Sequence, residues 1–587
     1  MCGIVIGSGA YWNENKINEY LKTIKHRGPD NTGVYINGDF YMGHVRLSII
    51  DTTEDSNQPF FFDKYVVSYN GEMFNYIEER SILIDKGYTF NTESDTEVII
   101  QMFKEYGLEF IHRVNGMFVI SIYDTESKNI YIWRDRFGIK PFYYTIQKGS
   151  FIGCSEIKPI LLDSNLDNFS WNKYAISSYI KDSITHYSNE TFYDGILNLE
   201  PGCFMEINTL NNDLKISKYF TLKKLEDVDS EISSDKLKRL LKDSVKIRMR
   251  SDVGFSSALS GGIDSSLITR LMQEVKKGDK IEVFSMLRES KDDFDTEFSL
   301  KYKELFPANN YTRVTPSKDK LTSILDEVIY SQEEPFGGPS IVLQNLMYRY
   351  MNDKGIKVII EGQGGDEVFI GYERYLFRDN VVQFFFKGGL GKISNQTGIP
   401  KIKTIFYWFF FRYSFIRKYA SIKKFGFKTS KLFKKYSNSN YISSFSNDLR
   451  NEDIRINEIT KFQLRRLLNY SDKNSMASSV EVRLPFLDYR VVEAAISISP
   501  PQMTKGYWSK YLLRTFLADF GLKEFAWRKN KNGFDAPVEM WDVLEFYPKK
   551  SSVEKFFHFD SIKNMDSKLK WKIANIRAIE KIYNVSI

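Results

Sequence analysis

The sequence contains few of the residues that disulfide frameworks and metal sites require. Its three cysteines, Cys2, Cys154 and Cys203, are too few and too far apart in 587 residues to form a disulfide framework or a zinc site. The five histidines are scattered, and neither HExxH nor another paired-ligand spacing occurs. These absences argue against zinc chemistry and favour a reducing compartment, so we expect a cytoplasmic protein.

Long apolar runs and leader signals are also missing. No stretch reaches the roughly 18 apolar residues that span a bilayer. The N-terminal sequence MCGIVIGSG lacks a charged region before an apolar stretch and lacks a small-residue cleavage site. We therefore expect a protein that is soluble or at most attached to a membrane surface.

Acidic residues are nearly absent from one segment of the chain. Between Arg374 and Lys435 there are 15 basic residues and a single acid, Asp379, whereas the rest of the chain has 67 basic and 74 acidic residues. Because the basicity is confined to one segment, it argues against a nucleic-acid partner that binds across the fold. The length predicts two or more domains.

The hydrophobic pattern changes near Leu222. Before it, short β segments over 40–51, 65–72, 116–124, 129–135 and 141–146 predict an α+β sandwich, with a helix over 95–106. Residues 222–235 are polar, which is typical of a linker leading into a helix capped near Ser233 or Ser234. We therefore predict a first domain over 1–222, a linker over 223–235 and a second domain over 236–587.

The second domain shows apolar strands that are followed by glycine-rich turns and helices. Residues 255–275 and 357–369 form two such units, 281–287 reads as a strand between them, and 457–483 is rich in helical pattern. This alternation predicts a parallel α/β sheet with ligands at the carboxyl ends of its strands.

Cys2 is a candidate nucleophile because it follows the initiator methionine. Removal of Met1 would leave a thiol and a free α-amine on the same residue, and an amine with a pKa of about 7.7–8.0 can accept the thiol proton. No histidine is then needed for catalysis.

Five motifs follow Cys2 in a fixed order. They are HRGPD (26–30), GHVRLSIID (43–51), YNGEMFN (69–75), ESDTE (93–97) and RDRFGIKPFYY (134–144). The series resembles the class II glutamine amidotransferase domain, which implies an N-terminal-nucleophile αββα sandwich that hydrolyses glutamine.

The resemblance implies a glutamine site whose residue types suit their roles. A guanidinium at Arg46 suits the substrate α-carboxylate, Asp95 and Glu72 suit its amine, and the Asn70 side chain with the Gly71 N–H suits an oxyanion. The full set of implied residues is Cys2, Arg46, Leu47, Ser48, Ile49, Ile50, Asn70, Gly71, Glu72 and Asp95. The alternative is that Arg46 pairs with Asp51 and that Asn70-Gly71 forms a hairpin turn.

In the second domain, SGGIDS (260–265) follows a short strand and opens a helix. Glycines, backbone N–H groups, serine hydroxyls and a helix N-terminus together suit phosphate, although GxxxxGK[ST] is absent. The loop resembles that of ATP pyrophosphatases. With the motifs at 361–375, 472–490 and 528–541, the whole chain resembles glutamine-hydrolysing asparagine synthetases. This resemblance implies an adenine-nucleotide α-hydrolase-like parallel α/β domain.

The second resemblance implies ATP as substrate and Mg²⁺ as cofactor. Asp264 and Asp366 match the magnesium carboxylates, and Lys531 matches a residue that neutralises departing pyrophosphate, unless it is a solvated charge. The implied nucleotide-binding residues are Leu259, Ser260, Gly261, Gly262, Asp264, Ser265, Met286, Glu361, Gly362 and Lys531.

Two positions depart from the family pattern. Glu361 stands where asparagine synthetases often have Ser, and Gln363 stands where many have a Glu that is suspected of acid–base work. We expect an aspartate acceptor, with glutamine as nitrogen donor, and a homodimer. The alternatives are a uronic-acid sugar as acceptor and a non-catalytic glutamine-sensing scaffold, which would require loss of Cys2 or of the loop.

A basic aromatic insertion spans 376–437 and contains IFYWFFF (405–411). Aromatic and basic residues together suit an anionic membrane surface, where each basic side chain contributes about 1 kcal/mol. The alternative, which we favour, is an irregular helical insertion whose aromatics cover the synthetase site or an ammonia passage.

Overall fold

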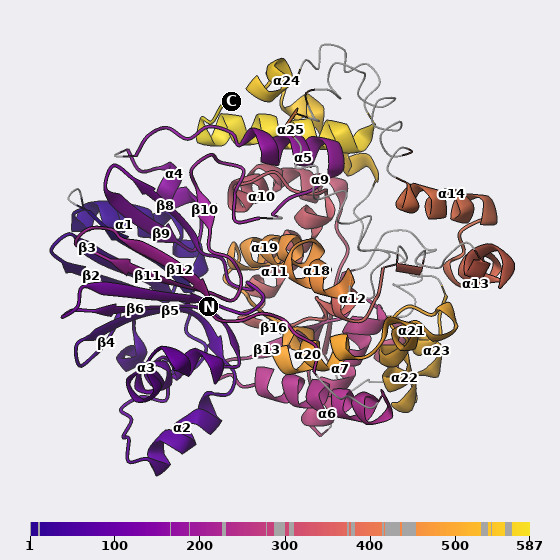
Figure 1. Cartoon of the computed structure of the whole chain (residues 1–587), viewed down its shortest axis with the longest axis horizontal. Helices are drawn as coiled ribbons and strands as arrows, with labels where there is room; N and C mark the ends of the chain where they lie inside the picture. The colour runs from indigo at the N-terminus through magenta and orange to yellow at the C-terminus, as the bar shows by residue number, and fades with distance from the viewer. Residues whose placement is uncertain are drawn as a thin grey trace.

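The computed structural model divides the chain into a strand-rich N-terminal domain and a larger C-terminal domain, which lie side by side (Figure 1). It describes residues 2–9, 12–164, 166–186, 188–225, 230–277, 279–286, 300–304, 310–372, 375–376, 382–413, 416, 432, 435–436, 454–529, 538–541, 543–557 and 566–587.

Two antiparallel six-stranded sheets form the N-terminal domain. In spatial order, the first sheet contains β10 (Leu197–Asn198), β8 (Tyr143–Gln147), β9 (Ser150–Cys154), β1 (Cys2–Ser8), β3 (Phe40–Arg46) and β2 (Asn31–Asn37). The second contains β12 (Leu214–Lys218), β11 (Cys203–Asn208), β7 (Asn129–Arg134), β6 (Gly116–Asp124), β5 (Tyr65–Met73) and β4 (Phe60–Phe62). The strands predicted from the sequence are therefore present.

Successive side chains of each strand point to opposite faces of its sheet, and both faces of each sheet are buried. Ile4 and Ile6 of β1 pack in one cluster with Val119 of the second sheet, so they lie between the sheets. Val5 packs instead with Leu21 of α1 (Glu14–Thr23), a helix that covers the first sheet.

The outer face of the second sheet is covered by α3 (Asp95–Tyr106), whose bounds match the predicted helix. Its residues Val98 and Met102 pack with Val67 and Ile120 of the strands beneath. The order helix, sheet, sheet, helix is the predicted αββα sandwich.

A five-stranded parallel sheet lies at the centre of the C-terminal domain. In spatial order it contains β15 (Asn310–Val314), β14 (Glu282–Met286), β13 (Phe255–Ala258), β16 (Val358–Ile360) and β17 (Glu481–Arg483). The strand order reverses direction between β13 and β16, and ligands of open α/β sheets bind at such a switch point. The predicted parallel α/β sheet is confirmed.

Helices surround this sheet (Figure 1). They include α6 (Ser230–Arg248), α7 (Ile263–Val275), α10 (Leu325–Gln332), α11 (Ser340–Asp353), α12 (Gly365–Val368), α18 (Ile454–Thr460), α19 (Gln463–Met476), α20 (Tyr489–Ser497), α22 (Tyr511–Asp519) and α25 (Ser567–Tyr583). The helices α10, α11 and α19 are among those drawn on the side of the strand-rich domain (Figure 1). The helix-rich pattern predicted over 457–483 corresponds to α18 and α19.

One boundary differs from the prediction. The helix expected to be capped near Ser233 or Ser234 begins at Ser230. Serine costs only about 0.5 kcal/mol more than alanine inside a helix, and Leu237, Leu241 and Val245 anchor α6 to the core. Packing of one face therefore sustains a helix that extends before the predicted cap.

The insertion contains helices, as expected. It includes a π-helical turn η5 (Val382–Phe386), α13 (Gly389–Thr397) and α14 (Lys401–Arg412). Trp408, Phe384 and Ile393 form a small cluster of their own, while Phe386 and Phe406 are exposed. Tyr507, which lies outside the insertion, packs against this cluster, and the covering role expected of the aromatics stays a prediction.

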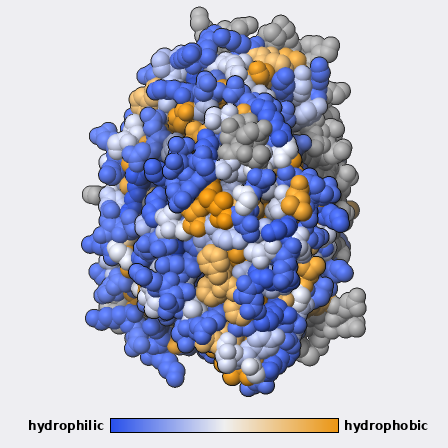
Figure 2. Space-filling model, turned by 90° about the vertical axis from the view of Figure 1, so that its left-hand side faces the viewer, coloured by the Kyte–Doolittle hydropathy of each residue, from blue (hydrophilic) through white to orange (hydrophobic). Residues whose placement is uncertain are grey.

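No helix among the described residues is both long and apolar enough to cross a membrane. Figure 2 shows the face formed by the strand-rich domain, which is mostly hydrophilic with small, separate hydrophobic patches.

Candidate active sites

Cys2 and Arg46 lie directly opposite each other on β1 and β3. Paired residues of antiparallel strands project from the same face of a sheet, so the thiol and the guanidinium belong to one site. Both side chains are buried, with exposures of 6% and 4%. Sheet register thus brings together the predicted nucleophile and the predicted carboxylate-binding cation.

The predicted oxyanion residues lie beside the nucleophile. The backbone nitrogen of Cys2 donates to Asn70 Oδ1 at 3.1 Å. Asn70 and Gly71 are interior residues of β5, so the alternative of a hairpin turn is wrong. A Cβ at Gly71 would lie 2.1 Å from the Met117 carbonyl oxygen, so only glycine fits there.

Burial raises the pKa of the Cys2 thiol, although a hydrogen bond from the Leu47 backbone acts in the opposite direction. The thiol is therefore held in its neutral form at rest. Because the thiolate is the nucleophile, a group close to the sulfur must accept the proton as the attack occurs.

The Arg46 guanidinium is held by oxygens that carry no full charge. It donates to the Thr53 carbonyl at 2.7 Å, to Asn57 Oδ1 at 2.9 Å and to the Asp51 carbonyl. The Asp51 carboxylate instead accepts from the backbone N–H of Glu93 at 2.8 Å, so the alternative Arg46–Asp51 ion pair is wrong. Among the described residues, no carboxylate lies within ion-pair distance of Arg46, which leaves its charge for an anion.

The segment after β3 is buried beside this site. Its Ser48 N–H donates to Asp30 Oδ2 at 2.8 Å, which fixes the loop to the motif at 26–30. The predicted glutamine-binding residues on this segment are Leu47, Ser48, Ile49 and Ile50, all of them buried.

Two buried carboxylates face the same region. Glu72 lies 3.5 Å from Arg483 Nη2 of β17, and its Oε2 atom is buried without a hydrogen-bond partner. Asp95 accepts from the Met73 N–H at 3.0 Å and from the Tyr69 hydroxyl at 3.1 Å. Burial raises the pKa of Asp95 to about 6, which those hydrogen bonds oppose. A substrate ammonium would satisfy these groups.

Arg27 connects the nucleophile to the other domain. Its Nε donates to the Cys2 carbonyl at 3.1 Å, and its Nη1 lies 3.1 Å from Glu156 and 2.9 Å from Asp472 of α19. The sequence places Arg27 and Asp472 in motifs, but it gave no reason to pair residues 445 positions apart.

A second group of buried charges continues along the domain interface. Lys158 pairs with Glu156 of its own domain and lies 3.3 Å from Glu333 of the other domain. Lys473 of α19 lies 3.1 Å from Glu333 and 3.3 Å from Glu334. The two domains therefore share ion pairs that neither domain completes alone.

The glycine-rich loop follows β13 at the switch point. Gly261 has φ of +78°, a conformation that favours glycine, and Gly262 caps α7 without a side-chain bond. Ser260 Oγ lies 3.1 Å from Ser265 Oγ. The first N–H groups of α7 lack intrahelical partners, which is the arrangement that binds phosphate oxygens.

Lys510 lies between the two predicted magnesium ligands. Its Nζ bonds to Asp264 and lies 2.6 Å from Asp366 Oδ1. Burial lowers the pKa of Lys510, but the two carboxylates outweigh it and raise the pKa. Lys510 has φ of +56°, and strained backbone of this kind clusters at functional sites. Sequence analysis missed Lys510 because no motif marks it.

The donor atoms at this position fit a hard divalent cation. Asp264 and Asp366 supply carboxylate oxygens, which Mg²⁺ prefers, and Asp264 Oδ1 is buried without a hydrogen-bond partner. No group of three or more His, Cys, Asp or Glu residues that could hold a metal occurs in the described part of the chain. A bound cation would therefore draw further ligands from phosphate or water.

The remaining predicted nucleotide-binding residues surround the same edge of the sheet. Leu259 N–H donates to the Phe284 carbonyl at 2.8 Å, and Met286 ends the neighbouring strand β14. A Cβ at Gly362 would lie 2.8 Å from Asp264 Cβ, so the segment after β16 packs closely against the loop. Lys531 lies outside the described residues.

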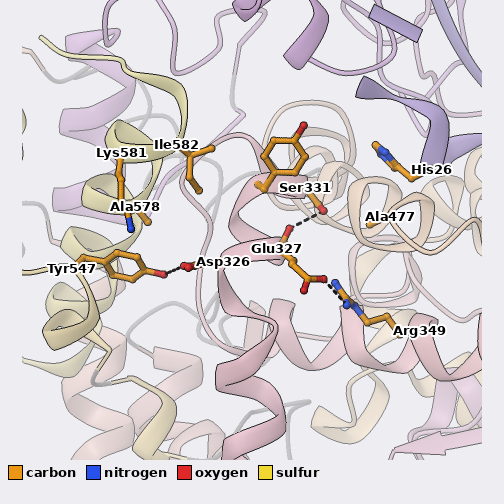
Figure 3. A pocket seen from close by; sticks show the side chains of 11 residues that line it. His26, Asp326, Glu327, Ser331, Arg349, Ala477, Tyr547, Ala578, Lys581 and Ile582 are labelled. Atoms are coloured by element: carbon orange, nitrogen blue, oxygen red, sulfur yellow. Dashed lines mark hydrogen bonds and ion pairs between the residues drawn. The ribbon is translucent and has the colours of Figure 1, made fainter. Parts of the chain in front are cut away.

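A cavity of about 450 Å³ lies elsewhere, between α10 and α25 (Figure 3). Tyr547 points toward Asp326 there, and Glu327 lies 2.7 Å from Arg349. Because its carboxylates already have partners and no predicted site residue lines it, we place the chemistry at the two sites above.

An amidotransferase sandwich with a buried Cys2, joined to a parallel sheet with a phosphate loop, defines an ATP-dependent glutamine amidotransferase. The glutamine amidotransferase domain family matches residues 1–220, and the asparagine synthase family matches residues 236–555. The chain belongs to the asparagine synthase family.

Three relatives are similar to this chain over most of its length. Asparagine synthetase [glutamine-hydrolyzing] 1 of Bacillus subtilis is 28% identical over 90% of this chain and 85% of its own length. Asparagine synthetase [glutamine-hydrolyzing] 2 of the same organism is 28% identical over 88% and 70%. Amidase chry2 of Gibberella zeae is 26% identical over 89% and 85%.

Among solved structures, the glutamine phosphoribosylpyrophosphate amidotransferase of B. subtilis covers 55% of this chain and 70% of its own. Its TM-score is 0.30 at 14% identity. The fold assignment therefore rests on the described sheets and the family matches.

Proposed function

We propose that this enzyme converts L-aspartate, ATP and glutamine into L-asparagine, AMP, diphosphate and glutamate. The observation that carries the proposal is the bonded connection Cys2–Arg27–Asp472, which joins the glutamine-site nucleophile to the synthetase domain. Two half-sites coupled in this way suit a reaction that makes ammonia at one site and uses it at the other.

In the glutamine half-reaction, Arg46 holds the substrate α-carboxylate, and Glu72 and Asp95 hold its amine. Cys2 attacks the side-chain amide, and the Asn70 side chain and Gly71 N–H stabilise the oxyanion. Once Met1 is removed, the Cys2 nitrogen is an α-amine that accepts the thiol proton. Asn70 Oδ1 orients that nitrogen through the contact at 3.1 Å.

In the synthetase half-reaction, the loop at 260–265 binds the β- and γ-phosphates, Leu259, Met286 and Gly362 border the adenosine, and Glu361 lies next to Gly362 at the same edge of the sheet. Asp264 and Asp366 would hold Mg²⁺, which neutralises phosphate charge when bound. Lys531 stabilises the departing diphosphate. The acceptor carboxylate attacks the α-phosphorus to form an acyl-adenylate, and ammonia then displaces AMP.

The domain boundaries that suit this division are 1–222, 223–235 and 236–587. Ammonia passes inside the protein between the two sites, because protonated ammonium in water is not a nucleophile. ATP and glutamine are abundant in the cytoplasm, where we place the enzyme. The homodimer implied by the resemblance remains a prediction, which the mass in solution tests.

Pyrophosphate release from ATP and Mg²⁺ with ammonium, measured with and without L-aspartate, tests the acceptor. Aspartate-dependent release together with asparagine detected by mass supports the proposal. No response to aspartate, from a protein that still hydrolyses glutamine, would exclude it. The competing acceptor is then a uronic-acid sugar, which the departure at Gln363 favours. Loss of both half-reactions would indicate a non-catalytic scaffold.

We also propose that the insertion contacts anionic membrane surfaces weakly. Ile402, Phe406 and Phe409 occur at helical spacing on one face of α14 and are 82%, 55% and 38% exposed. Vesicles containing anionic lipid should retain the protein at low salt and release it as salt rises. Retention that is equal on neutral vesicles, or equal for Phe406→Glu, would contradict this proposal.

A further inference from the structure

We propose that the Glu361 side chain is the base that accepts a proton from ammonia as it displaces AMP, in place of the glutamate that Gln363 lacks. This inference rests on the proposed function and assigns one step of it. It does not depend on which carboxylate is the acceptor.

The position of Glu361 places it at the reacting edge of the sheet. It follows β16 directly, and its N–H donates to the Arg483 carbonyl of β17 at 3.0 Å, which extends the strand pairing by one residue. The phosphate loop follows β13, the neighbour of β16 on its other side. Glu361 and the loop therefore leave the same end of adjacent parallel strands.

Glu361 and Gln363 are two residues apart in the short segment that leaves β16. Gly362 is the residue between them, and it packs against Asp264 of the loop. The sequence EGQ thus carries its carboxylate two residues earlier than the family pattern, within the same short segment beside the phosphate loop.

The surroundings of Glu361 are those of a proton acceptor and not of a structural ion pair. Its side chain is 7% exposed, and Oε1 accepts from the Tyr348 hydroxyl of α11 at 3.0 Å. Among the described residues, no Lys, Arg or His lies within ion-pair distance of it. By contrast, Glu156 and Glu334 each lie within 3.3 Å of a buried cation.

Burial raises the pKa of Glu361 to about 7, and the Tyr348 hydrogen bond opposes that rise. The charged residues on the neighbouring elements α19 and β17 already form ion pairs with other residues. Asp472 pairs with Arg27, Lys473 with Glu333 and Glu334, and Arg483 with Glu481. A carboxyl with such a pKa can take and return a proton near neutral pH.

Glu361 also lies at the synthetase end of the connection from Cys2. The Tyr348 hydroxyl is 3.4 Å from Ser471 Oγ of α19, and the next residue, Asp472, binds Arg27 at 2.9 Å. Arg27 in turn binds the Cys2 carbonyl. Ammonia released at Cys2 would therefore enter the synthetase domain on the side where the Glu361 carboxylate is buried.

The step balances as follows. The ammonia lone pair forms the new C–N bond at the acyl carbon, and the carbonyl π pair moves to oxygen. One N–H proton passes to a Glu361 oxygen. The C–O bond to AMP then breaks, AMP leaves with its electron pair, and the carbonyl re-forms as the amide.

The test uses Glu361→Gln in the full chain, with ammonium and an acceptor that supports pyrophosphate release by the parent protein. Gln keeps the shape and can still accept from Tyr348, and a melting temperature near that of the parent checks the fold. We expect the ratio of amide formation to pyrophosphate release to fall about 100-fold or more, whatever the change in pyrophosphate release itself, and glutaminase activity, whose site lies in the other domain, to stay within about threefold. The pH dependence of amide formation near pH 7 should disappear.

The double variant Glu361→Ser/Gln363→Glu restores the family arrangement and should recover amide formation, whereas Glu361→Ser alone should not. Amide formation unchanged in Glu361→Gln, or pyrophosphate release that falls in the same proportion, would overturn the assignment. Failure of the proposed function has a different signature, since the parent protein would then release no aspartate-dependent pyrophosphate.

Discussion

Arg27 of the amidotransferase domain and Asp472 of the synthetase domain form a buried ion pair across the domain interface, with Nη1 and Oδ2 2.9 Å apart. Both side chains are at most 2% exposed. Because Arg27 also holds the Cys2 carbonyl, a substitution in one domain should alter chemistry in the other.

Asp472→Ala should therefore affect both stability and coupling. Removing one partner of a buried pair costs about 3–5 kcal/mol, because the other charge stays buried. We expect that loss in urea unfolding, and a larger fall in glutamine-dependent than in ammonium-dependent amide formation. The exposed pair of Lys64 and Glu126 gives the control: Lys64→Ala should leave the urea unfolding curve almost unchanged. Equal falls with both nitrogen sources would show that the pair is structural only.

Cys2→Ala should abolish glutaminase activity while leaving ammonium-dependent amide formation intact. The thiol serves only the first half-reaction, so glutamate release from glutamine and amide formation from ammonium measure the two halves separately. Cys203→Ala, at another buried free cysteine, should retain both activities. Loss of the ammonium-dependent reaction in Cys2→Ala would contradict the division of labour.

Gly371→Ala should remove nucleotide-dependent turnover and spare glutaminase. A Cβ at Gly371 would lie 1.9 Å from Asp366 Oδ1 and 2.2 Å from Lys510 Cε. It would therefore displace the Lys510 side chain, which bridges the two carboxylates, and Asp366, a predicted magnesium ligand. Pyrophosphate release should fall at least tenfold. Gly254→Ala is the matched control, since nothing lies within 4 Å of a Cβ there. Normal release by Gly371→Ala would show that the site tolerates rearrangement.

Acid should destabilise the protein through His44. Burial lowers the pKa of His44 to about 3, from 6.5 in the unfolded chain. Between those values the unfolded state binds more protons, so the free energy of unfolding decreases by about 1.4 kcal/mol for each pH unit as pH falls below 6.5. In His44→Gln that part of the slope should be absent, as read from urea unfolding at pH 5 and pH 7. If the free energy of unfolding decreased equally with pH in both proteins, His44 would not be the cause of this slope.

Much of the fold could be predicted because local patterns determine it. The helix at 95–106 has a serine cap and apolar residues at helical spacing. The βα units are recognised by an apolar strand that is followed by a glycine-rich turn and a helix. The pairing of Cys2 with Arg46 follows only from strand register, which the sequence does not specify. The family resemblance, and not a physical argument from the sequence, placed both residues in the glutamine site.

The buried charges could not be predicted, for a physical reason. Lys510 is 246 residues from Asp264, and its role arises from the packing of α22 against the loop and from the space left by Gly371. Local propensity carries no information about such contacts. The same holds for Arg483, which belongs to β17 yet lies 3.5 Å from Glu72 of the other domain.

Lys158 lies between Glu156 of its own domain and Glu333 of the other domain, so the two domains depend on each other for this ion pair. If the amidotransferase half were exchanged for one that lacks a lysine at this position, Glu333 would lose one of its two buried cations and keep only Lys473. Substitutions on one side of this boundary must then be accompanied by substitutions on the other. Chimeras built at the linker should consequently be less stable unless both sides of the interface are transplanted together.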